Sequence, residues 1–234
     1  MSPTALVLGV GPGLGMSVAH RFGREGYDVV VVSRRSERHA EYLEALAGAG
    51  VNARAFAADV RDSAQLSSIV DCLGPVDAVY YGPGGTDLDD MPGEITTTTS
   101  DEARAAMNWL YPAIDVTRRL VPGMVERGGG GLLFAGGLSA VRPMPVLGAL
   151  ALSSAALRNY AVTLNAALAD KGVYAGTLTI GGVVERGDIH KMVASRPEQF
   201  GDLTGHTLDP DEIAETAWQM FVERDRAEEV FSAL

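Results

Sequence analysis

Cysteine is nearly absent from this sequence, and with it the usual means of cross-linking a chain or holding a metal ion. The one cysteine, Cys72, has no partner for an intrachain disulfide, and no cysteine or histidine cluster has the spacing of zinc ligands. A chain of this kind suits a reducing compartment. We therefore expect a cytoplasmic protein without a metal site.

Long hydrophobic runs and positive charge are also scarce. No stretch reaches the roughly 18 to 20 apolar residues of a membrane span, and the N-terminus lacks the regions of a secretion signal. The chain has 19 Lys and Arg against 30 Asp and Glu, a formal net charge of −11. Because nucleic acids and acidic membranes are bound by cationic surfaces, we expect neither as a partner. An anionic ligand must be held by a local group of basic residues.

The remaining composition is that of one globular domain. The chain has 234 residues, of which 47% are hydrophobic, and this is enough for a sizeable core. Its 28 glycines and 11 prolines are scattered as single turns and are not gathered into a low-complexity tract. We expect a single domain over residues 1–234, without repeats or linkers.

Strand-like and helix-like stretches alternate along the chain. The residues from Val29 to Val32 form an unbroken β-branched run, which is typical of a strand buried on both faces in a parallel sheet. The alternation predicts a doubly wound, Rossmann-like α/β fold. Strands are expected at residues 4–8, 27–33, 53–57, 77–81, 132–135, 173–180 and 229–231, and helices at 14–24, 37–46, 63–73, 101–120, 147–169 and 211–222.

Two longer stretches, 82–100 and 181–209, are predicted to be irregular. In doubly wound sheets, ligands bind beyond the carboxyl ends of the strands, and long loops there are often functional. We expect residues 181–209 to form a substrate lid.

A glycine-rich turn joins the first strand to the first helix. Gly9, Gly13 and Gly15 fit the spacing G-x-x-x-G-x-G, and Leu14 opens the helix. Glycines at such a turn let the backbone approach a pyrophosphate, which is held by the free N–H groups of the helix N-terminus. The turn therefore predicts dinucleotide binding, with a purely structural turn as the alternative.

The end of the second strand is basic where NAD-binding proteins carry an acid. The residues there are Ser33, Arg34 and Arg35, with Arg38 one turn further on. An acidic residue would accept hydrogen bonds from a ribose 2′-hydroxyl, whereas guanidinium groups suit a 2′-phosphate. This favours NADP(H) over NAD(H). The alternative is a solvated, basic start of a helix.

The third strand is followed by Asp59 and Val60. These residues are predicted to hold the adenine, with the carboxylate of Asp59 accepting a hydrogen bond from its amino group. An aspartate at this place is equally well explained as the capping residue of a turn.

The order and spacing of these landmarks resemble the short-chain dehydrogenase/reductase family in its short, single-domain form. Further landmarks are Asn108 in the stretch 107–110, the stretch 120–124, and 182–184. The resemblance implies about seven parallel strands with helices on both faces, a nicotinamide cofactor, and a dimer or tetramer. The cofactor-binding residues are then expected to be Gly9, Gly13, Leu14, Gly15, Ser33, Arg34, Arg35, Asp59, Val60, Gly82, Gly182 and Val184.

The catalytic residues of the family are missing from their places. The family uses a serine, a tyrosine and a lysine, and the resemblance puts these positions at Gly137, Leu150 and Ser154. Leucine has no ionisable group, and a serine hydroxyl is a far weaker acid than an activated tyrosine. Asn108 is the one family catalytic position that is kept, and its role is either catalytic or structural.

Ordinary carbonyl reduction should therefore be slow, because loss of a general acid typically costs about 100-fold to 10,000-fold. Hydride transfer suits an acceptor that needs little proton donation, such as an iminium or a conjugated enone. Replacement catalytic groups are expected among Asn108, Ser139, Ser153 and Ser154. Weaker candidates, each with an ordinary structural explanation, are Tyr80 and Tyr81 as proton donors, Arg142 and Arg186 as carboxylate ligands, and His190 and His206 as acids.

Three functions remain open at this point. The first is an NADP(H)-dependent oxidoreductase of atypical mechanism. The second is a redox-inactive cofactor-binding protein or partner subunit, and the third is a non-redox enzyme that reuses the pocket. The basic pair Arg34 and Arg35 favours the first two, while the missing catalytic side chains favour the last two.

One long stretch predicts self-association. From residue 128 to residue 169 the only charged residues are Arg142 and Arg158. A helix as apolar as 147–169 would be poorly solvated on an outer face. We expect a homodimer or homotetramer formed through helices 101–120 and 147–169.

Overall fold

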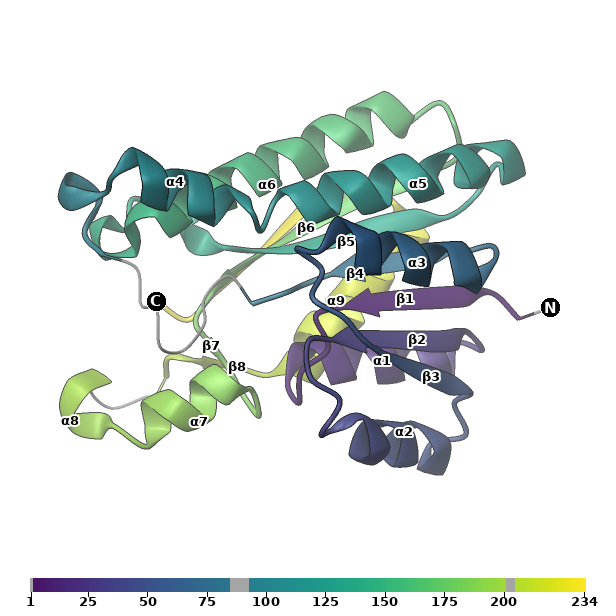
Figure 1. The fold of residues 1–234 in the computed structure, drawn as a ribbon, viewed down its shortest axis with the longest axis horizontal. Coiled ribbons are helices and arrows are strands. Elements are labelled where there is room, and N and C mark those ends of the chain that lie inside the picture. Colours follow the sequence, from purple (N-terminus) through teal and green to yellow (C-terminus); the bar gives the residue numbers. More distant parts are fainter. Residues whose placement is uncertain (1, 85–92, 201–204) are drawn as a thin grey trace.

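A seven-stranded parallel sheet forms the centre of the computed structural model, which describes residues 2–84, 93–200 and 205–234 (Figure 1). The strand order is β3-β2-β1-β4-β5-β6-β9, and each neighbouring pair is parallel. The doubly wound α/β fold and its seven predicted strands are confirmed. The strands are β1 (Thr4–Leu8), β2 (Asp28–Ser33), β3 (Ala53–Ala57), β4 (Ala78–Tyr81), β5 (Gly131–Gly137), β6 (Tyr174–Gly181) and β9 (Glu228–Ser232).

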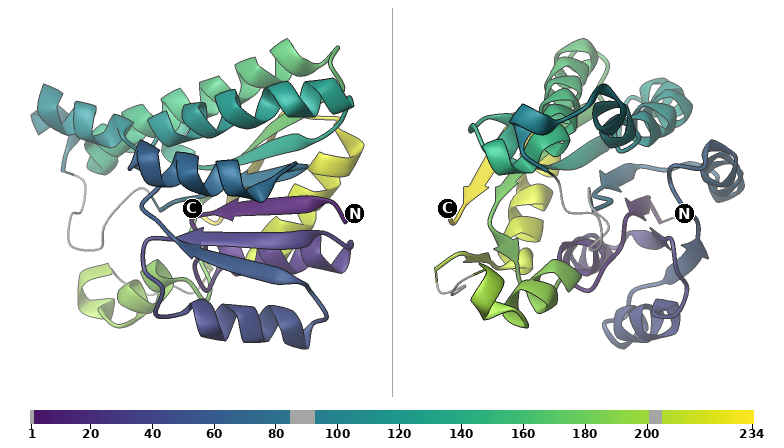
Figure 2. Two further views of the ribbon diagram at one scale, coloured as in Figure 1. Left: turned by 45° about the vertical axis from the view of Figure 1, so that its right-hand side comes forward. Right: turned by 60° about the vertical axis from the view of Figure 1, so that its left-hand side comes forward.

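Helices cover both faces of the sheet (Figure 2). Because neighbouring residues of a strand point to opposite faces, β1 contributes Leu6 and Leu8 to one core and Ala5 and Val7 to the other. The first core packs against α3, α5 and α6, and the second against α1, α2 and α9. These helices are α1 (Leu14–Arg24), α2 (His39–Gly48), α3 (Ser63–Leu73), α5 (Tyr111–Arg127), α6 (Gly148–Leu168) and α9 (Pro210–Glu223).

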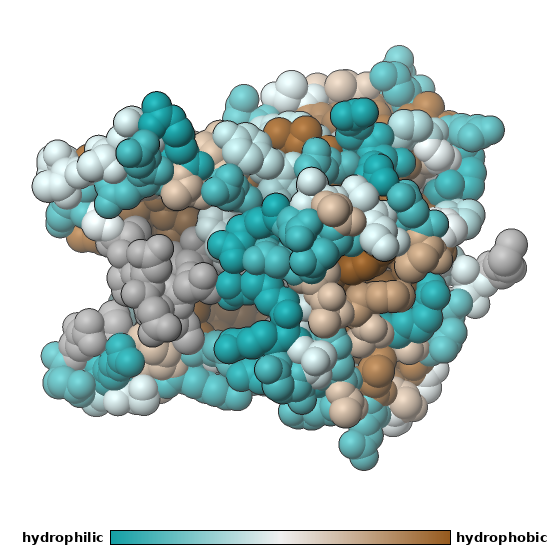
Figure 3. Space-filling view, viewed as in Figure 1, coloured by the Kyte–Doolittle hydropathy of each residue, from teal (hydrophilic) through white to brown (hydrophobic). Residues whose placement is uncertain are grey.

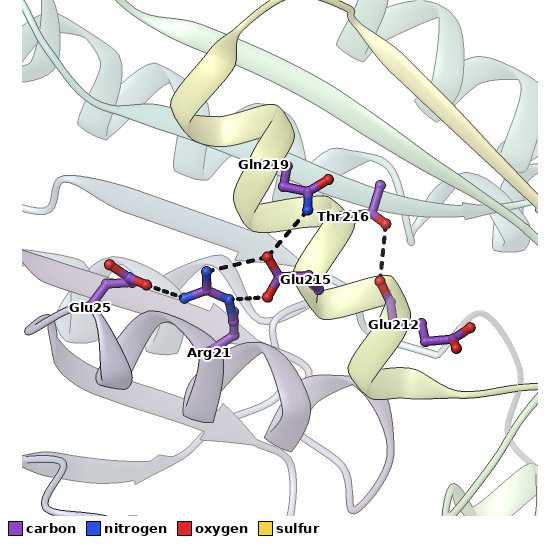
Figure 4. A network of polar contacts seen from close by, with 6 residues as sticks. All are labelled: Arg21, Glu25, Glu212, Glu215, Thr216 and Gln219. Carbon is purple, nitrogen blue, oxygen red and sulfur yellow. Dashed lines mark hydrogen bonds and ion pairs between the residues drawn. The ribbon is translucent and has the colours of Figure 1, made fainter.

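The first and last helices lie side by side and are joined by an arginine (Figure 4). Arg21 of α1 donates to Glu215 of α9 at 2.6 Å and to Glu25 at 2.5 Å. Its guanidinium also lies 4.9 Å from the ring centroid of Trp218, which packs edge-on against Phe22. The contact ties the C-terminal segment to the unit that carries the glycine turn.

The prediction of one helix over residues 101–120 is wrong. The structure has two helices, α4 (Ser100–Met107) and α5, and Asn108 caps the end of α4. Pro112 lies in the first turn of α5. A proline has no N–H to bond the carbonyl four residues back, so the helix cannot run through this point without losing a hydrogen bond.

The stretch 181–209 was predicted to be irregular, and this is also wrong in part. It holds α7 (Asp188–Ala194), α8 (Pro197–Phe200) and the short paired strands β7 (Val183–Val184) and β8 (Thr207–Leu208). The helices are too short to show a clear apolar period in the sequence. Together these elements, called the lid segment below, project from the carboxyl ends of the strands (Figure 1).

Two further properties concern the described part of the chain. No helix in it has the length and hydropathy needed to cross a membrane. Within the same residues, no three His, Cys, Asp or Glu side chains come together as a metal site would require.

Candidate functional site

The glycine turn is held in a tight space by the rest of the protein. A Cβ atom on Gly9, which has a φ of +85°, would lie 2.4 Å from the nitrogen of Pro83, and one on Gly13 would lie 2.9 Å from the carbonyl oxygen of Glu185. A Cβ on Gly15 would lie 2.8 Å from the Cα of Val10. Glycine is therefore required at positions 9, 13 and 15. These contacts are with the protein's own backbone, so they explain the glycines even before any ligand is considered.

The same turn leaves room on its other side. A Cβ on Gly11 would meet nothing within 4 Å. The N-cap residue of α1 is Gly13, and it makes no side-chain hydrogen bond to the helix. An α-helix whose N-terminus lacks a side-chain cap has N–H groups available for an anion. Open space and available donors therefore occur together where the sequence predicted a pyrophosphate.

The basic residues at the end of β2 lie on the surface beside this turn. Arg34 and Arg35 are exposed, and the hydroxyl of Ser33 donates to the carbonyl of Arg35 at 2.9 Å. Arg38 is the N-cap residue of α2 and pairs with Asp188 of the lid segment at 2.8 Å. Ser33 thus shapes the turn that presents the arginines.

Asp59 and Val60 follow β3, as predicted. The carboxylate of Asp59 pairs with Arg61 at 2.7 Å, and this hydrogen bond lowers its pKa. The guanidinium of Arg61 lies 4.7 Å from the ring centroid of Trp109. Asp59 is therefore held ionised and in place, and Val60 is buried.

Two of the three positions predicted for the family's catalytic residues, Gly137 and Ser154, lie close together. Gly137 ends β5, and a Cβ on it would lie 3.5 Å from the hydroxyl oxygens of both Ser139 and Ser154. This is ordinary contact, so the space of one small side chain is left between two hydroxyl groups. Within the described residues, the Ser139 hydroxyl is buried and has no hydrogen-bond partner. A buried hydroxyl without a partner is costly, and such groups often serve a function.

Two other candidates, Ser153 and Asn108, have a structural explanation. The hydroxyl of Ser153 donates to the carbonyl of Leu150 at 3.1 Å, within the same helix. Asn108 is exposed and lies at the break between α4 and α5. Leu150 itself is half-buried on α6. Of the four predicted catalytic candidates, Ser139 and Ser154 alone border the space beside Gly137.

The two tyrosines of β4 are packing residues. The hydroxyl of Tyr81 donates to the carbonyl of Trp109 at 2.6 Å, and burial raises its pKa. Burial also raises the pKa of Tyr80. A raised pKa makes each hydroxyl a weaker acid, so neither suits the transfer of a proton to a substrate.

The polar residues of the lid segment and its neighbours mostly bind other parts of the chain. Arg186, at a φ of 65°, reaches Asp211 at 2.8 Å and Asp209 at 3.3 Å. His206 contacts the carbonyl of Ala233 at 2.8 Å, and His190 is half-buried on α7. Arg142, outside the lid, donates to the carbonyl of Leu234 at 3.0 Å. These contacts join residues far apart in the sequence, so no sequence pattern signals them.

Three predicted cofactor residues lie at the same edge of the sheet. The N–H of Gly82 donates to the carbonyl of Leu8 at 2.9 Å, which fixes the turn after β4 beside the glycine turn. Gly182 follows β6 and packs closely on Leu208. Val184 belongs to β7 and pairs with Leu208 in the small second sheet.

A cavity of about 470 Å³ lies beside α1, and neither Ser139 nor Ser154 is among its lining residues. It is lined by α1, α2 and the arginine of the lid segment, and it includes Pro12 of the glycine turn. Burial, followed by repulsion from Arg24, lowers the pKa of His20 in this cavity. Figure 3 shows one face of the molecule, on which hydrophilic residues cover much of the middle of the view and hydrophobic residues form smaller patches to their right.

Comparison with known proteins gives a consistent result. A family model described as short chain dehydrogenase matches residues 3–193. The ketoacyl reductase HetN of Nostoc sp. is 29% identical over 206 residues, which is 86% of this chain and 70% of that protein.

Solved structures of similar fold cover nearly the whole chain. L-sorbose reductase from Gluconobacter frateurii, complexed with NADPH and L-sorbose, has a TM-score of 0.83 at 20% identity, covering 99% of this chain and 95% of that one. ElxO with NADP bound has a TM-score of 0.82 at 18% identity, covering 100% of this chain and 97% of that one. At these identities the likeness is one of fold.

Proposed function

The chain belongs to the short-chain dehydrogenase family, and on that premise we propose that it is an NADP(H)-dependent oxidoreductase of atypical mechanism that acts on a small molecule. The observation that carries the proposal is the place of the glycine turn. The turn follows β1, and the N–H groups of Gly9 and Val10 donate to the carbonyl of Val32, two residues before Arg34. This arrangement suits a pyrophosphate and a 2′-phosphate at neighbouring points.

The residues fit a nicotinamide dinucleotide, and each has a distinct task. The N–H groups at the start of α1, with Gly13, Leu14 and Gly15, would hold the pyrophosphate. Arg34 and Arg35 would pair with the 2′-phosphate. Asp59 and Val60 would border the adenine, while Gly82, Gly182 and Val184 would line the nicotinamide end. When bound, the cofactor supplies a hydride, and the protein orients the substrate beside it.

The serine hydroxyls determine which substrates are suitable. Ser139 and Ser154 border the space beside Gly137, and a hydroxyl there donates a hydrogen bond to an oxygen that gains negative charge. A serine does not release its proton as an activated tyrosine does. A reduced ketone needs that proton at once, whereas an iminium becomes a neutral amine with no proton added. A conjugated enone gives an enolate, which takes its proton from water afterwards.

Two measurements test this proposal. Titration of NADPH by fluorescence should show binding that weakens at least tenfold in an Arg34→Gln/Arg35→Gln variant, while NADH binding changes little. NADPH oxidation should then be followed with matched iminium, enone and ketone substrates, and we expect the ketones to be slowest. A dissociation constant for NADPH above the millimolar range would contradict the proposal.

A second function is favoured by the empty position at Gly137 and the leucine at position 150. A chain that binds NADPH tightly but oxidises it with none of the three substrate classes is a cofactor-binding protein or partner subunit. Failure to bind NADPH or NADH would instead favour a non-redox enzyme that reuses the pocket.

We also propose a homodimer or homotetramer formed through α4, α5 and α6. Large apolar side chains are exposed on these helices and on the turn before α6: Tyr111 by 50%, Val146 by 57% and Leu152 by 47%. Large apolar side chains that are left exposed suit burial in an association surface.

A further inference from the structure

The lid segment places an acidic side chain beside the basic residues that follow β2. Asp188 is the first residue of α7, and its carboxylate lies 2.8 Å from the guanidinium of Arg38. The two residues are 150 positions apart in the chain. The hydrogen bond to Asp188 is the main cause of a raised pKa at Arg38. The pair therefore joins α7 of the lid to α2.

The backbone leading to Asp188 also crosses the glycine turn. Gly13 lies so close to the carbonyl of Glu185 and the nitrogen of Gly187 that no Cβ fits there. Residues 185–188 thus run from the start of α1 to the start of α2. A 2′-phosphate held by Arg34 and Arg35 would lie near residues 185–188, because Arg38, three residues after Arg35, pairs with Asp188.

Few other contacts hold α7 to the body of the protein. Within the described residues, α7 packs mainly on β7 and α8, which belong to the lid themselves. Its side chain Val193 is buried, but Ile189 is exposed by 46%. The Arg38–Asp188 pair is itself half-exposed, with 45% and 38% of the side chains accessible, so a competing anion can reach it. Exposed pairs of this kind are weak and are readily exchanged.

We propose that Asp188 competes with the 2′-phosphate of NADP(H) for Arg38, so that binding of the phosphate releases α7 from α2. This inference rests on the proposed function. A phosphate carries more negative charge than a carboxylate and accepts more hydrogen bonds from guanidinium groups. NAD(H) has a hydroxyl at this position and leaves the pair intact. Asp188 therefore weakens the binding of NADP(H) relative to NAD(H). Binding of NADP(H), but not of NAD(H), then detaches α7 of the lid segment from α2.

Two fragments of the cofactor test the coupling without involving the substrate site. Adenosine 2′,5′-bisphosphate carries the 2′-phosphate, and adenosine 5′-monophosphate lacks it. At saturating concentrations, we expect the bisphosphate to raise amide hydrogen exchange in residues 188–194 at least threefold, and the monophosphate to leave it unchanged. An Asp188→Asn variant should exchange at the faster rate with no ligand present.

The same variant tests the choice of cofactor. Asp188→Asn should bind NADPH two- to fivefold more tightly and NADH unchanged, because the phosphate then has no carboxylate to compete with for Arg38. Glu198→Gln is the matched control: it removes the same charge from an exposed position on α8 and should alter neither affinity.

The outcomes separate this inference from the proposed function. If the bisphosphate binds more tightly than the monophosphate but exchange in α7 is equal with both, the release of α7 is wrong. Equal gains in NADPH affinity for Asp188→Asn and Glu198→Gln would show a general charge effect and overturn the competition. If the bisphosphate does not bind, the proposed function fails, and this inference fails with it.

Discussion

Gly137 leaves a space that two serine hydroxyls border, and this space is the main chemical feature of the site. Its distances of 3.5 Å to Ser139 and Ser154 are those of ordinary contact, so a side chain fits there without moving either hydroxyl. The buried hydroxyl of Ser139 has no partner in the described part of the fold. We expect a bound substrate to supply that partner.

Ser139→Ala is therefore expected to separate function from stability. Turnover of an enone should fall roughly tenfold to 100-fold, because a donor to developing negative charge is lost. The melting temperature should stay the same or rise, since removing an unpaired buried hydroxyl costs the fold nothing. Enone kinetics and thermal unfolding measure the two effects.

Ser153→Ala is the matched control for that variant. The hydroxyl of Ser153 already donates within α6 at 3.1 Å, so its loss should leave turnover nearly unchanged. If both variants lose turnover equally, Ser139 has no special role in the reaction.

A second prediction restores the residues that the family uses. The triple variant Gly137→Ser/Leu150→Tyr/Ser154→Lys should reduce a ketone at least about 100-fold faster than the natural chain, because it gains a general acid. The same variant with Leu150→Phe is the control, since phenylalanine fills the same space without a hydroxyl. Equal rates for the tyrosine and phenylalanine variants, at equal NADPH affinity, would show that the site is not aligned with the family's geometry.

At the scale of elements, local sequence patterns predicted most strands and helices, and the helix over residues 101–120 was the main error. The unbroken valines of β2 and the glycine turn before α1 occur where the sequence placed them. The structure divides residues 101–120 into α4 and α5, and Pro112 lies in the first turn of α5, where a proline costs no helical hydrogen bond. The lid helices α7 and α8 lacked any such pattern.

The last strand makes an ion pair whose effect depends on pH. Glu228 of β9 accepts from Arg158 of α6 at 2.7 Å and from Thr179 of β6 at 2.7 Å. The hydrogen bond from Arg158 is the main cause of its lowered pKa. A lowered pKa stabilises the fold above the ordinary value of 4.5, and this contribution is lost as the pH falls through the lowered value.

Glu228→Gln should therefore reduce the free energy of unfolding by about 1 kcal/mol at pH 7 and by much less near pH 3. Denaturant unfolding at the two pH values measures this difference. Glu229→Gln is the control, because Glu229 pairs only with the nearby Arg226 of the same segment in the ion pairs described. An equal loss at both pH values would show that the charge of Glu228 does not stabilise the fold.

At the scale of the whole molecule, the chain is acidic overall yet has a long stretch with little charge. That stretch, residues 128–169, contains β5, the turn before α6 and α6 itself, and in it Val146 and Leu152 remain exposed. We expect light scattering at micromolar concentration to show a dimer or tetramer. Leu152→Lys should shift it toward the monomer, because a charge is poorly tolerated in a buried interface.

A surface valine outside this region provides the control for association. Val222 of α9 is exposed by 55%, and Val222→Lys should leave the assembly unchanged. A monomer for the natural chain at these concentrations would contradict the proposal.

The sequence by itself determined the order of the seven strands of the main sheet, the glycine turn and the basic end of β2, and it predicted that the family's catalytic positions are empty. These depend on residues near one another in the chain, where side-chain period, backbone freedom and charge act locally. Only the tertiary structure brought Ser139 and Ser154 to Gly137, and only it paired Arg38 with Asp188. Such contacts join distant segments, and they exist because the sheet places the ends of its strands at one edge.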